Sequence, residues 1–572
     1  MKMLFGYLKK YKRFVILGPL FKLVEAFLEL LNPLLVAEII DIGVSTGDTG
    51  FIIRMGLIIL ASNVIAFCLS LFSQKCASLT SVGVATDIRD DMFKKISSFS
   101  HSELDKFGTA SLVNRLINDI MQIENAVSVF MRMMIRVPFL LVGAFVLSLI
   151  INIKTSLIFL VLIPIMLIIL IFYMKKTTPY FKIMRTKLDK ITKITKENLS
   201  GTRVIRAFNK QNDEQRRFED ASEDYTHTSI KVSKISALLN PIIYLIVDAA
   251  TIALLYIGGI EINIGGMTQG DIIALIDYIA IITISLLLLS QIIVMFVRTV
   301  ASLHRIEEVK KTTPSISDPI NAREFKKFNF ENILEFKNVS FNYSMDNKEK
   351  SFIKDLSFEL KPKQTLGIIG GTGSGKTTIA NLITRFYDVT NGEILYKGKN
   401  VKDFTLEQLR REISIVQQRS TLFTGSLRDN MRLRDQNVSD EEIVEALKIS
   451  QAWQFVSEWP NGLDYQIMAG GKNVSGGQMQ RLTIARALIN RPELLILDDS
   501  SSALDFLTDS NLRKALKKLD STLIIISQRA TSIKNADLII VLDNGDVVGM
   551  GKHADLMKNC EIYREIYDSQ AK

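Results

Sequence analysis

The sequence predicts a membrane all-α domain of six transmembrane helices fused to an α/β domain built around a P-loop. Three observations support this fold class: six apolar stretches lie before residue 300, a G-x-x-x-x-G-K-S/T motif spans 370–377, and strands alternate with helices from about residue 331 onward. A chain of 572 residues is long enough for more than one domain. We expect a transmembrane domain at 1–300, a linker at 301–330 and a nucleotide-binding domain at 331–572.

The composition favours a membrane partner and no nucleic-acid partner. The formal net charge is +10, and the mean hydropathy of +0.21 is high for a soluble protein of this size. Because the chain has long apolar runs, an anionic membrane surface is the better explanation of the excess of lysine and arginine. Cys68, Cys76 and Cys560 have no metal-ligand spacing and imply no disulfide framework.

The six apolar stretches are the predicted membrane spans. The fourth contains no charged residue and is long enough to cross about 30 Å of hydrocarbon, whereas the others carry isolated polar groups. One such stretch by itself could be a buried helix of a soluble protein, but six within 300 residues favour a membrane domain. They are Phe14–Ile40, Ile52–Phe72, Val127–Ile151, Ser156–Met174, Ile235–Ile260 and Ile272–Val297.

Charged residues between the spans predict the orientation. The short connectors at 41–50, 152–155 and 261–271 hold a single basic residue, whereas the N-terminus and the long connectors at 73–126 and 175–234 are rich in lysine and arginine. By the positive-inside rule, the long connectors and both termini are cytoplasmic. The apolar run after the basic N-terminus is long and lacks a small-residue cleavage site, so we expect a retained membrane segment.

Each long connector contains one break in its expected helix. The segments 102–116 and 200–208 each hold a cap residue, a glycine and a few apolar groups. On spacing alone, each break is either a short crossing helix that docks on a cytoplasmic domain or a solvated helical turn.

The glycine-rich stretch at 370–377 is the strongest motif in the chain. It follows a predicted buried strand at 364–369 and precedes a helical apolar pattern, which is the context a P-loop requires. Backbone N–H groups would turn onto phosphate oxygens, Lys376 would reach the β- and γ-phosphates, and the Thr377 hydroxyl would bind Mg²⁺. We therefore expect a bound nucleoside triphosphate with Mg²⁺.

Three other features of the second domain bear on the same chemistry. Tyr343 follows a predicted strand and is either an adenine-stacking aromatic or a surface residue. A buried strand at 494–497 ends in Asp498, which would hold Mg²⁺, and Asp499, which lies where a group that polarises attacking water is expected. Ser475–Gln478 begins a second helix whose N-terminus can bind an anion, and this spare site suggests a second nucleotide shared with another chain.

Taken together, these motifs resemble those of an ABC exporter half-transporter, in which six spanning helices are fused to one nucleotide-binding domain. The resemblance covers essentially the full length, implies ATP as the nucleotide, and identifies the two connector breaks with coupling helices. The ATP-binding residues that it implies are Tyr343, Gly370, Gly371, Thr372, Gly373, Ser374, Gly375, Lys376, Thr377, Thr378 and Gln418. The implied metal ligands are Thr377, Gln418 and Asp498, the signature residues for a partner's site are Ser475, Gly476, Gly477 and Gln478, and the D-loop residue is Asp505.

Two catalytic positions depart from the family pattern. The family usually has glutamate where this chain has Asp499, and histidine where it has Gln528. Aspartate is one methylene shorter, and a displacement of about 1 Å can cost ~100-fold in rate. Glutamine can bond a γ-phosphate but does not become a cation near neutral pH. We expect this site to bind ATP and to hydrolyse it slowly or not at all; the alternative is neutral drift in a site that still works.

The signature motif has no such departure, and it leads us to expect a site shared with a partner chain. In the resembled family, one chain's P-loop faces the other chain's signature, so Ser475–Gln478 can serve a partner that has the glutamate and the histidine. The chain thus resembles the degenerate-site subunit of heterodimeric multidrug ABC exporters, in the cell membrane of a bacterium. Weak or absent ATP hydrolysis is expected of the chain alone.

Carboxylates inside the predicted spans are the only sequence signal for a cargo. Glu25, Glu29, Asp248 and Asp277 either line a cavity for small cationic amphiphiles or form ion pairs within the chain or with the partner. Export of drugs or other amphiphiles is the leading function; a lipid or peptide exporter and a regulatory ATP-binding membrane subunit are the alternatives.

Overall fold

The computed structural model describes residues 2–319, 330–343, 352–500 and 503–571. The chain divides into two compact units. A helical unit comprises Met1–Ser97 and Ala110–Thr312, and an α/β unit comprises Ser98–Thr109 and Thr313–Lys572. The predicted fold class, a helical unit with membrane-length helices followed by an α/β unit, is confirmed.

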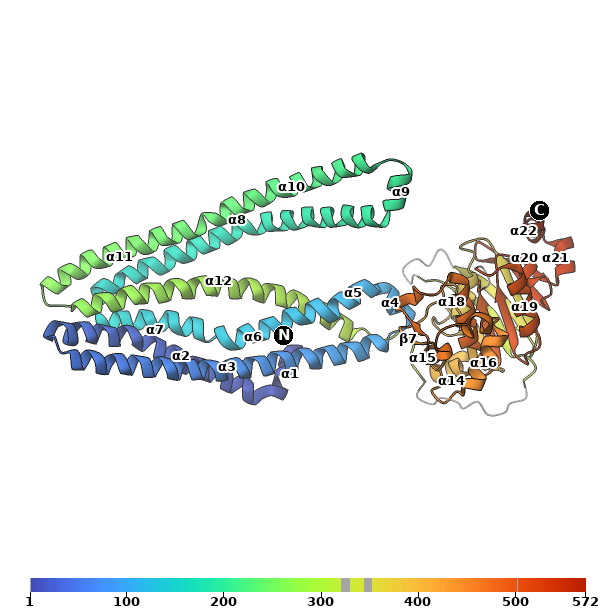
Figure 1. Ribbon diagram of the computed structural model, residues 1–572, viewed down its shortest axis with the longest axis horizontal. Coiled ribbons are helices and arrows are strands. Elements are labelled where there is room, and N and C mark those ends of the chain that lie inside the picture. The colour runs from blue at the N-terminus through green and yellow to red at the C-terminus, as the bar shows by residue number, and fades with distance from the viewer. Residues whose placement is uncertain (1, 320–329, 344–351, 501–502, 572) are drawn as a thin grey trace. The chain divides into compact units, whose positions relative to one another are not determined.

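Long helices make up the helical unit (Figure 1). Among the described residues, five helical stretches are long and apolar enough to cross a membrane: Thr49–Ser97, Thr109–Ile151, Ile153–Ser200, Gln211–Asn263 and Gln269–Lys311. In chain order its elements are α1 (Lys2–Leu8), η1 (Lys9–Tyr11), α2 (Lys12–Glu38), η2 (Ile39–Val44), α3 (Thr49–Ser97), α5 (Thr109–Asn114), η3 (Arg115–Asp119), α6 (Ile120–Met133), α7 (Arg136–Ile151), α8 (Ile153–Ser200), α9 (Thr202–Ala207), α10 (Gln211–Ala237), α11 (Leu239–Asn263) and α12 (Gln269–Lys311).

The first predicted span corresponds to α2, which is a continuous helix but differs in composition from the other five stretches. It carries Lys22, Glu25 and Glu29 in its middle part, so it is more polar than a typical spanning helix. The charge is compensated locally: Lys22 Nζ lies 2.6 Å from a Glu25 carboxylate oxygen, and both side chains are largely buried.

Two of the spanning helices, α8 and α12, extend well beyond their predicted apolar stretches as unbroken helices. α8 runs from Ile153 to Ser200 and packs along α10, and α9 lies at the turn between them (Figure 1). α9 occupies the second predicted break. The last helix of the unit, α12, continues through Lys311 into the segment expected to be a linker, because Leu303, Ile306 and Val309 place a buried apolar face at helical spacing.

The α/β unit is organised around three sheets. A parallel sheet has the order β12-β11-β3-β10-β9-β6 with only β12 antiparallel, a second sheet has the order β2-β1-β4-β5, and β7 pairs with β8. The strands are β1 (Leu334–Phe341), β2 (Ile353–Leu360), β3 (Thr365–Gly370), β4 (Asn391–Tyr396), β5 (Lys399–Asn400), β6 (Ile413–Val416), β7 (Gly425–Ser426), β8 (Gln466–Ile467), β9 (Leu494–Asp498), β10 (Thr522–Ile526), β11 (Leu538–Asp543) and β12 (Asp546–Gly551).

Helices cover the sheets and form a second, mainly helical lobe. One core lies between the two large sheets and α13, and a separate core joins the helices of the lobe to β9. The helices are α4 (His101–Phe107), α13 (Lys376–Ile383), η4 (Val401–Asp403), α14 (Leu406–Glu412), α15 (Leu427–Met431), α16 (Asp440–Ile449), α17 (Trp453–Val456), η5 (Gly462–Asp464), η6 (Ala469–Gly471), α18 (Gly476–Leu488), α19 (Phe506–Leu516), α20 (Ala530–Ile533), α21 (His553–Asn559) and α22 (Glu561–Ala571).

The first predicted break forms α4, which belongs to the α/β unit although its neighbours in sequence belong to the helical unit. Ser100 and Glu103 form a capping box at its start, and Gly108, with φ of +73°, ends it. The His101 ring stacks on Phe386 at 4.3 Å between centroids, and the Tyr387 hydroxyl donates to Asp105 at 2.5 Å. The first break is therefore a docking helix and not a solvated turn.

Candidate functional site

Four parallel strands bring the predicted site residues to one edge of the sheet. The P-loop follows β3, Asp498 ends β9, Gln418 follows β6 and Gln528 follows β10. Because these strands are parallel neighbours, their carboxyl ends lie at the same edge, where α/β proteins bind ligands.

Glycines shape the P-loop between β3 and α13. A Cβ at Gly370 would clash with the carbonyl oxygen of Leu542 on β11, so the close approach of two strands requires glycine there. Gly373 and Gly375 have φ of +83° and +101°, conformations that L side chains rarely adopt. This backbone lets successive N–H groups face one point at the start of α13, which is the anion cradle that the motif predicts.

Lys376 is held inside the loop. Its Nζ donates to the carbonyl oxygens of Gly370 at 2.9 Å and Gly371 at 2.5 Å. Burial lowers the pKa of its ammonium group, while the nearby carboxylates of Asp498 and Asp499 oppose that shift. The side chain is thus anchored at the mouth of the cradle, within reach of a phosphate bound there.

Asp498 and Thr377 supply oxygen ligands of the kind that Mg²⁺ prefers. Thr377 and Asp498 line the same cavity, and burial raises the pKa of the Asp498 carboxyl group, an effect that the nearby Thr377 opposes. Within the described residues there is no group of three or more histidine, cysteine or carboxylate side chains that could hold a metal ion by themselves. These two oxygens therefore fit a Mg²⁺ ion that takes its remaining ligands from phosphate and water.

Asp499 is the first of the two altered positions. Its backbone has φ of +47°, and its N–H donates to the Ile526 carbonyl at 2.9 Å. Burial raises the pKa of the Asp499 carboxyl, and Lys376, Arg529 and the nearby Gln418 and Gln528 oppose that shift. The shortened carboxylate thus lies among polar groups of the chain itself.

Tyr343 lies at the edge of the same site in an aromatic cluster. Its ring packs edge-on against Phe341, Phe352 and Tyr387, at 4.7, 5.3 and 5.1 Å between centroids. Its hydroxyl lies 2.9 Å from the Thr378 hydroxyl, and 45 % of the residue is exposed. One ring face can therefore receive a planar base while the other contacts hold the ring still.

Most of the predicted residues line one cavity of about 270 Å³. Gln528 contributes its exposed side chain, and Ile526 forms part of the wall. The lining residues are Tyr343, Phe352, Thr372, Gly373, Ser374, Gly375, Lys376, Thr377, Thr378, Gln418, Asp498, Asp499, Ile526 and Gln528.

The signature residues do not line this cavity. Ser475 caps α18 and forms a capping box with Gln478, and the α18 N-terminus lies in the helical lobe. A side chain at Gly476 would meet no atom within 4 Å, so this helix start faces open space. Asp505 likewise caps α19, accepting from the Thr508 N–H at 2.8 Å, while the first D-loop residue, Ser502, lies outside the described residues.

Sequence reasoning missed two residues that support the site. Gln570 on α22 donates to the Gln528 carbonyl at 2.7 Å and accepts from the Ala530 N–H at 2.8 Å. These two hydrogen bonds hold the backbone of the loop that carries Gln528. Gln480, which is 3 % exposed, accepts from the Ala503 N–H and donates to the Asp499 carbonyl. No local pattern marks either residue, because each bonds backbone far away in sequence.

The intramembrane carboxylates fall into two classes. Glu25 pairs with Lys22, and Glu29 accepts from Arg136 Nη2 at 2.7 Å, as the ion-pair alternative expects. Asp248 and Asp277 are exposed on α11 and α12, and the structure gives neither an ion pair nor a hydrogen bond for their carboxylates within the described residues.

Comparisons with known proteins match both units. Residues 15–286 match the family described as the ABC transporter transmembrane region, and residues 353–502 match the family described as the ABC transporter. An uncharacterized ABC transporter ATP-binding protein of Bacillus subtilis, YfiB, is 34 % identical over 571 residues, covering 99 % of this chain and 98 % of that protein. An uncharacterized ABC transporter ATP-binding protein of Mycobacterium tuberculosis is 33 % identical over 570 residues, with 99 % and 97 % covered. An ATP-dependent lipid A-core flippase of Mannheimia succiniciproducens is 31 % identical over 553 residues, with 95 % and 91 % covered.

Proposed function

Because this chain belongs to the ABC transporter family and has the exporter arrangement of a membrane region fused to an ATP-binding domain, we propose that it is one subunit of a heterodimeric, ATP-driven exporter. Its own P-loop site binds ATP and hydrolyses it weakly, and its signature motif completes a competent site on the partner.

One observation carries this proposal: the residues that bind are present in the cavity, whereas the two that drive hydrolysis are altered there. Lys376, Thr377 and Asp498 keep the arrangement that holds a triphosphate and Mg²⁺. Asp499 and Gln528 share the same cavity, but one is short and the other cannot become a cation. Phosphoryl transfer depends on positioning and charge, so these two changes weaken chemistry more than binding.

The exposed α18 N-terminus supports the shared-site part of the proposal. Ser475, Gly476 and Gly477 lie outside the chain's own cavity, with Gly476 facing open space, and they begin a helix whose N-terminus can bind an anion. A partner with glutamate and histidine at the positions of Asp499 and Gln528 would hold its ATP between its own P-loop and this helix N-terminus. Two copies of the present chain would pair two weak sites.

The cargo that we propose is a drug or another small amphiphile, moved out of a bacterial cell across its cytoplasmic membrane, with both termini in the cytoplasm. Asp248 and Asp277, which have exposed carboxylates on apolar helices, support a cavity that favours cationic molecules. Lipid export is a second candidate, because the lipid A-core flippase is similar over nearly the full chain.

The test is a signature substitution, Gly476→Asp, in this chain, purified in nanodiscs with the half-transporter encoded beside it. No atom lies within 4 Å of the new Cβ, so the fold is preserved, while the carboxylate repels a phosphate at the α18 N-terminus. We expect ATP hydrolysis by the complex to fall at least tenfold, although binding of a fluorescent ATP analogue to this chain's own P-loop is unchanged. The same substitution in the partner should have a small effect.

Assays of the chain without its partner can contradict the proposal. If it hydrolyses ATP and exports an amphiphilic dye as fast as the pair does, the heterodimer proposal is wrong. If the pair binds ATP but neither hydrolyses it nor exports any dye or lipid, the regulatory-subunit alternative holds instead.

A further inference from the structure

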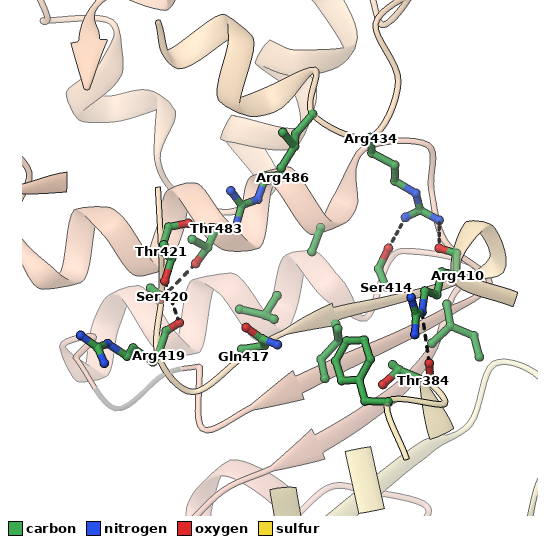
Figure 2. A pocket seen from close by; sticks show the side chains of 16 residues that line it. Thr384, Arg410, Ser414, Gln417, Arg419, Ser420, Thr421, Arg434, Thr483 and Arg486 are labelled. Atoms are coloured by element: carbon green, nitrogen blue, oxygen red, sulfur yellow. Dashed lines mark hydrogen bonds between the residues drawn. The ribbon is translucent and has the colours of Figure 1, made fainter. Parts of the chain in front are cut away.

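Two cavities away from the nucleotide site have opposite chemistry. On the α/β unit, a groove of about 310 Å³ is lined by Arg410, Arg419, Arg434 and Arg486 (Figure 2). In the helical unit, a pocket of about 350 Å³ has walls supplied mainly by α1, α6 and α12. The walls of this second cavity, here called the α1 pocket, are apolar.

The α1 pocket offers almost no hydrogen-bonding group to an occupant. α1 lines it with Leu4 and Leu8, and α6 lines it with Phe130. Among the described residues that line it, only Thr299 has a polar side chain, and its hydroxyl donates to the Met295 carbonyl at 2.9 Å. Water needs several polar partners to occupy a cavity, whereas a dry apolar cavity of about 150 Å³ already takes up benzene. The α1 pocket therefore suits an apolar molecule.

Polar contacts hold α1 in place beside the pocket. The Tyr7 hydroxyl donates to the Asp91 carboxylate of α3 at 2.5 Å, and Lys310 of α12 donates to the same hydroxyl. The Tyr11 ring packs so closely on α3 that a Cβ at Gly83 would lie 2.5 Å from it. A helix of seven residues is not stable by itself, so these contacts keep α1 against α3 and α12 (Figure 1).

The α1 pocket lies where three predicted spans end on one side of the membrane. The first apolar stretch begins at Phe14, the third begins at Val127 and the sixth ends at Val297. Val15, Val127 and Val297 all line the pocket. It is thus at the depth where acyl chains meet head groups, and the apolar molecules present there are the lipid chains of the leaflet on the side of the N-terminus.

Three exposed cations stand beside the pocket in the chain. Lys9, Lys12 and Arg13, here called the N-terminal basic cluster, lie between the lining residues Leu8 and Val15. Within the described residues, the structure gives none of their side chains an ion pair or a hydrogen bond. Cations at this level of a membrane attract anionic head groups.

We propose that the α1 pocket holds one acyl chain of an anionic phospholipid from the leaflet on the side of the N-terminus, with the phosphate against the N-terminal basic cluster. One buried chain alone binds weakly, and the basic cluster supplies the second contact that a selective site needs. The lipid is a resident of this site and not the cargo. Neither ATP nor a partner chain enters the proposal, so it stands apart from the proposed function.

Tryptophan fluorescence tests the site, because Trp453 and Trp459, the two tryptophans of the chain, lie in the α/β unit. Phe130→Trp places an indole in the pocket wall, where Phe130 is 42 % exposed. The full chain is placed in nanodiscs with equal mole fractions of phosphatidylglycerol and phosphatidylcholine, and one of the two lipids carries brominated chains, which quench an indole on contact. We expect brominated phosphatidylglycerol to quench this indole about threefold more than brominated phosphatidylcholine does.

An exposed position outside the pocket provides the first control. Phe67, on α3 near the same end of the second predicted span, is 64 % exposed and does not line the pocket. Phe67→Trp contacts lipid without a binding site, so both brominated lipids should quench it equally.

Neutralising the N-terminal basic cluster tests the head-group contact. Lys9→Gln with Lys12→Gln and Arg13→Gln should remove the preference for phosphatidylglycerol at residue 130, and 0.5 M salt should weaken it in the native cluster. A matched control takes the same charge from exposed residues of α8 and should leave the preference intact. Its substitutions are Lys175→Gln, Lys182→Gln and Arg185→Gln.

Three results would overturn the proposal. The first is equal quenching at residue 130 by the two lipids, or loss of the preference in the α8 control as well. The second is an indole at residue 130 that neither lipid quenches, which means that a protein segment fills the pocket. The third is relief of quenching by an amphiphilic dye, which assigns the pocket to the cargo. ATP hydrolysis has no part in these measurements, so none of these results bears on the heterodimer proposal.

Discussion

At Asp499 the chain has a carboxylate whose reach is one methylene shorter than that of glutamate. Burial raises the pKa of this carboxyl group, and the nearby Lys376 and Arg529 lower it. Its left-handed backbone, with φ of +47°, fixes the direction in which the side chain leaves the strand. One added methylene would move the carboxylate outward without changing the wall that supports it.

We therefore predict that Asp499→Glu combined with Gln528→His raises hydrolysis at this chain's own site by about 10- to 100-fold, because position and charge are both restored. The measurement is ATP turnover in a complex whose partner carries glutamine in place of its catalytic glutamate, so that only this site can act. Asp499→Asn, which changes charge but not length, should give no gain; an equal gain from it would contradict the argument.

Gln570 is the residue that connects the C-terminal helix to the cavity. Its side-chain amide bonds the Gln528 carbonyl and the Ala530 N–H, much as a neighbouring strand would. Removing both bonds would free the loop that carries Gln528, the residue that the proposed function places against a γ-phosphate.

Gln570→Ala should therefore weaken binding of a non-hydrolysable ATP analogue about three- to tenfold and leave ADP binding nearly unchanged, since each bond is worth about 1 kcal/mol. Glu565→Ala, on the same helix and exposed, is the control and should change neither affinity. Equal weakening of ATP and ADP binding would mean that Gln570 has only a structural role.

At the scale of elements, the contacts of α4 include a titratable group. Its His101 ring stacks on Phe386, and burial lowers the pKa of that imidazole below 6.5; Arg410 acts in the same direction and Asp105 opposes it. In the folded state His101 is thus neutral at a pH where the unfolded chain already binds a proton.

The sign of the pH dependence follows from this difference. The contribution of His101 to stability is complete above pH 6.5 and is lost as the pH falls from 6.5 through the lower folded-state pKa. We predict that the melting temperature of the chain in nanodiscs falls less between pH 7.5 and 5.5 for His101→Phe than for the native chain. His553, whose pKa burial also lowers, remains in both proteins, so the difference isolates α4.

At the scale of the whole molecule, substitutions at Asp248 and Asp277 test whether the exporter prefers a cationic cargo. Asp248→Asn with Asp277→Asn removes two exposed carboxylates from the helical unit while leaving the Glu29–Arg136 pair intact. If these acids favour cations, export of a cationic dye by the complex should fall several-fold, and export of a neutral dye of similar size should stay within about twofold. Equal loss for both dyes would reject a charge-selecting role.

The sequence by itself determined the helical membrane region, the α/β domain and the strand–loop–helix around Lys376, and it placed Asp499 and Gln528 at the ends of two strands. These features depend on neighbours a few residues apart: apolar length sets a spanning helix, and glycine spacing sets a phosphate loop. They can be predicted without knowledge of contacts between residues that are far apart in the chain. The same is true of the breaks that became α4 and α9.

Only the tertiary structure decided which distant groups meet. It placed Gln570 on the loop of Gln528, paired Glu29 with Arg136, assigned α4 to the α/β unit, and gathered four arginines around one groove. None of these contacts has a local signature, because each arises when separate helices and strands pack and bring together side chains far apart in the chain.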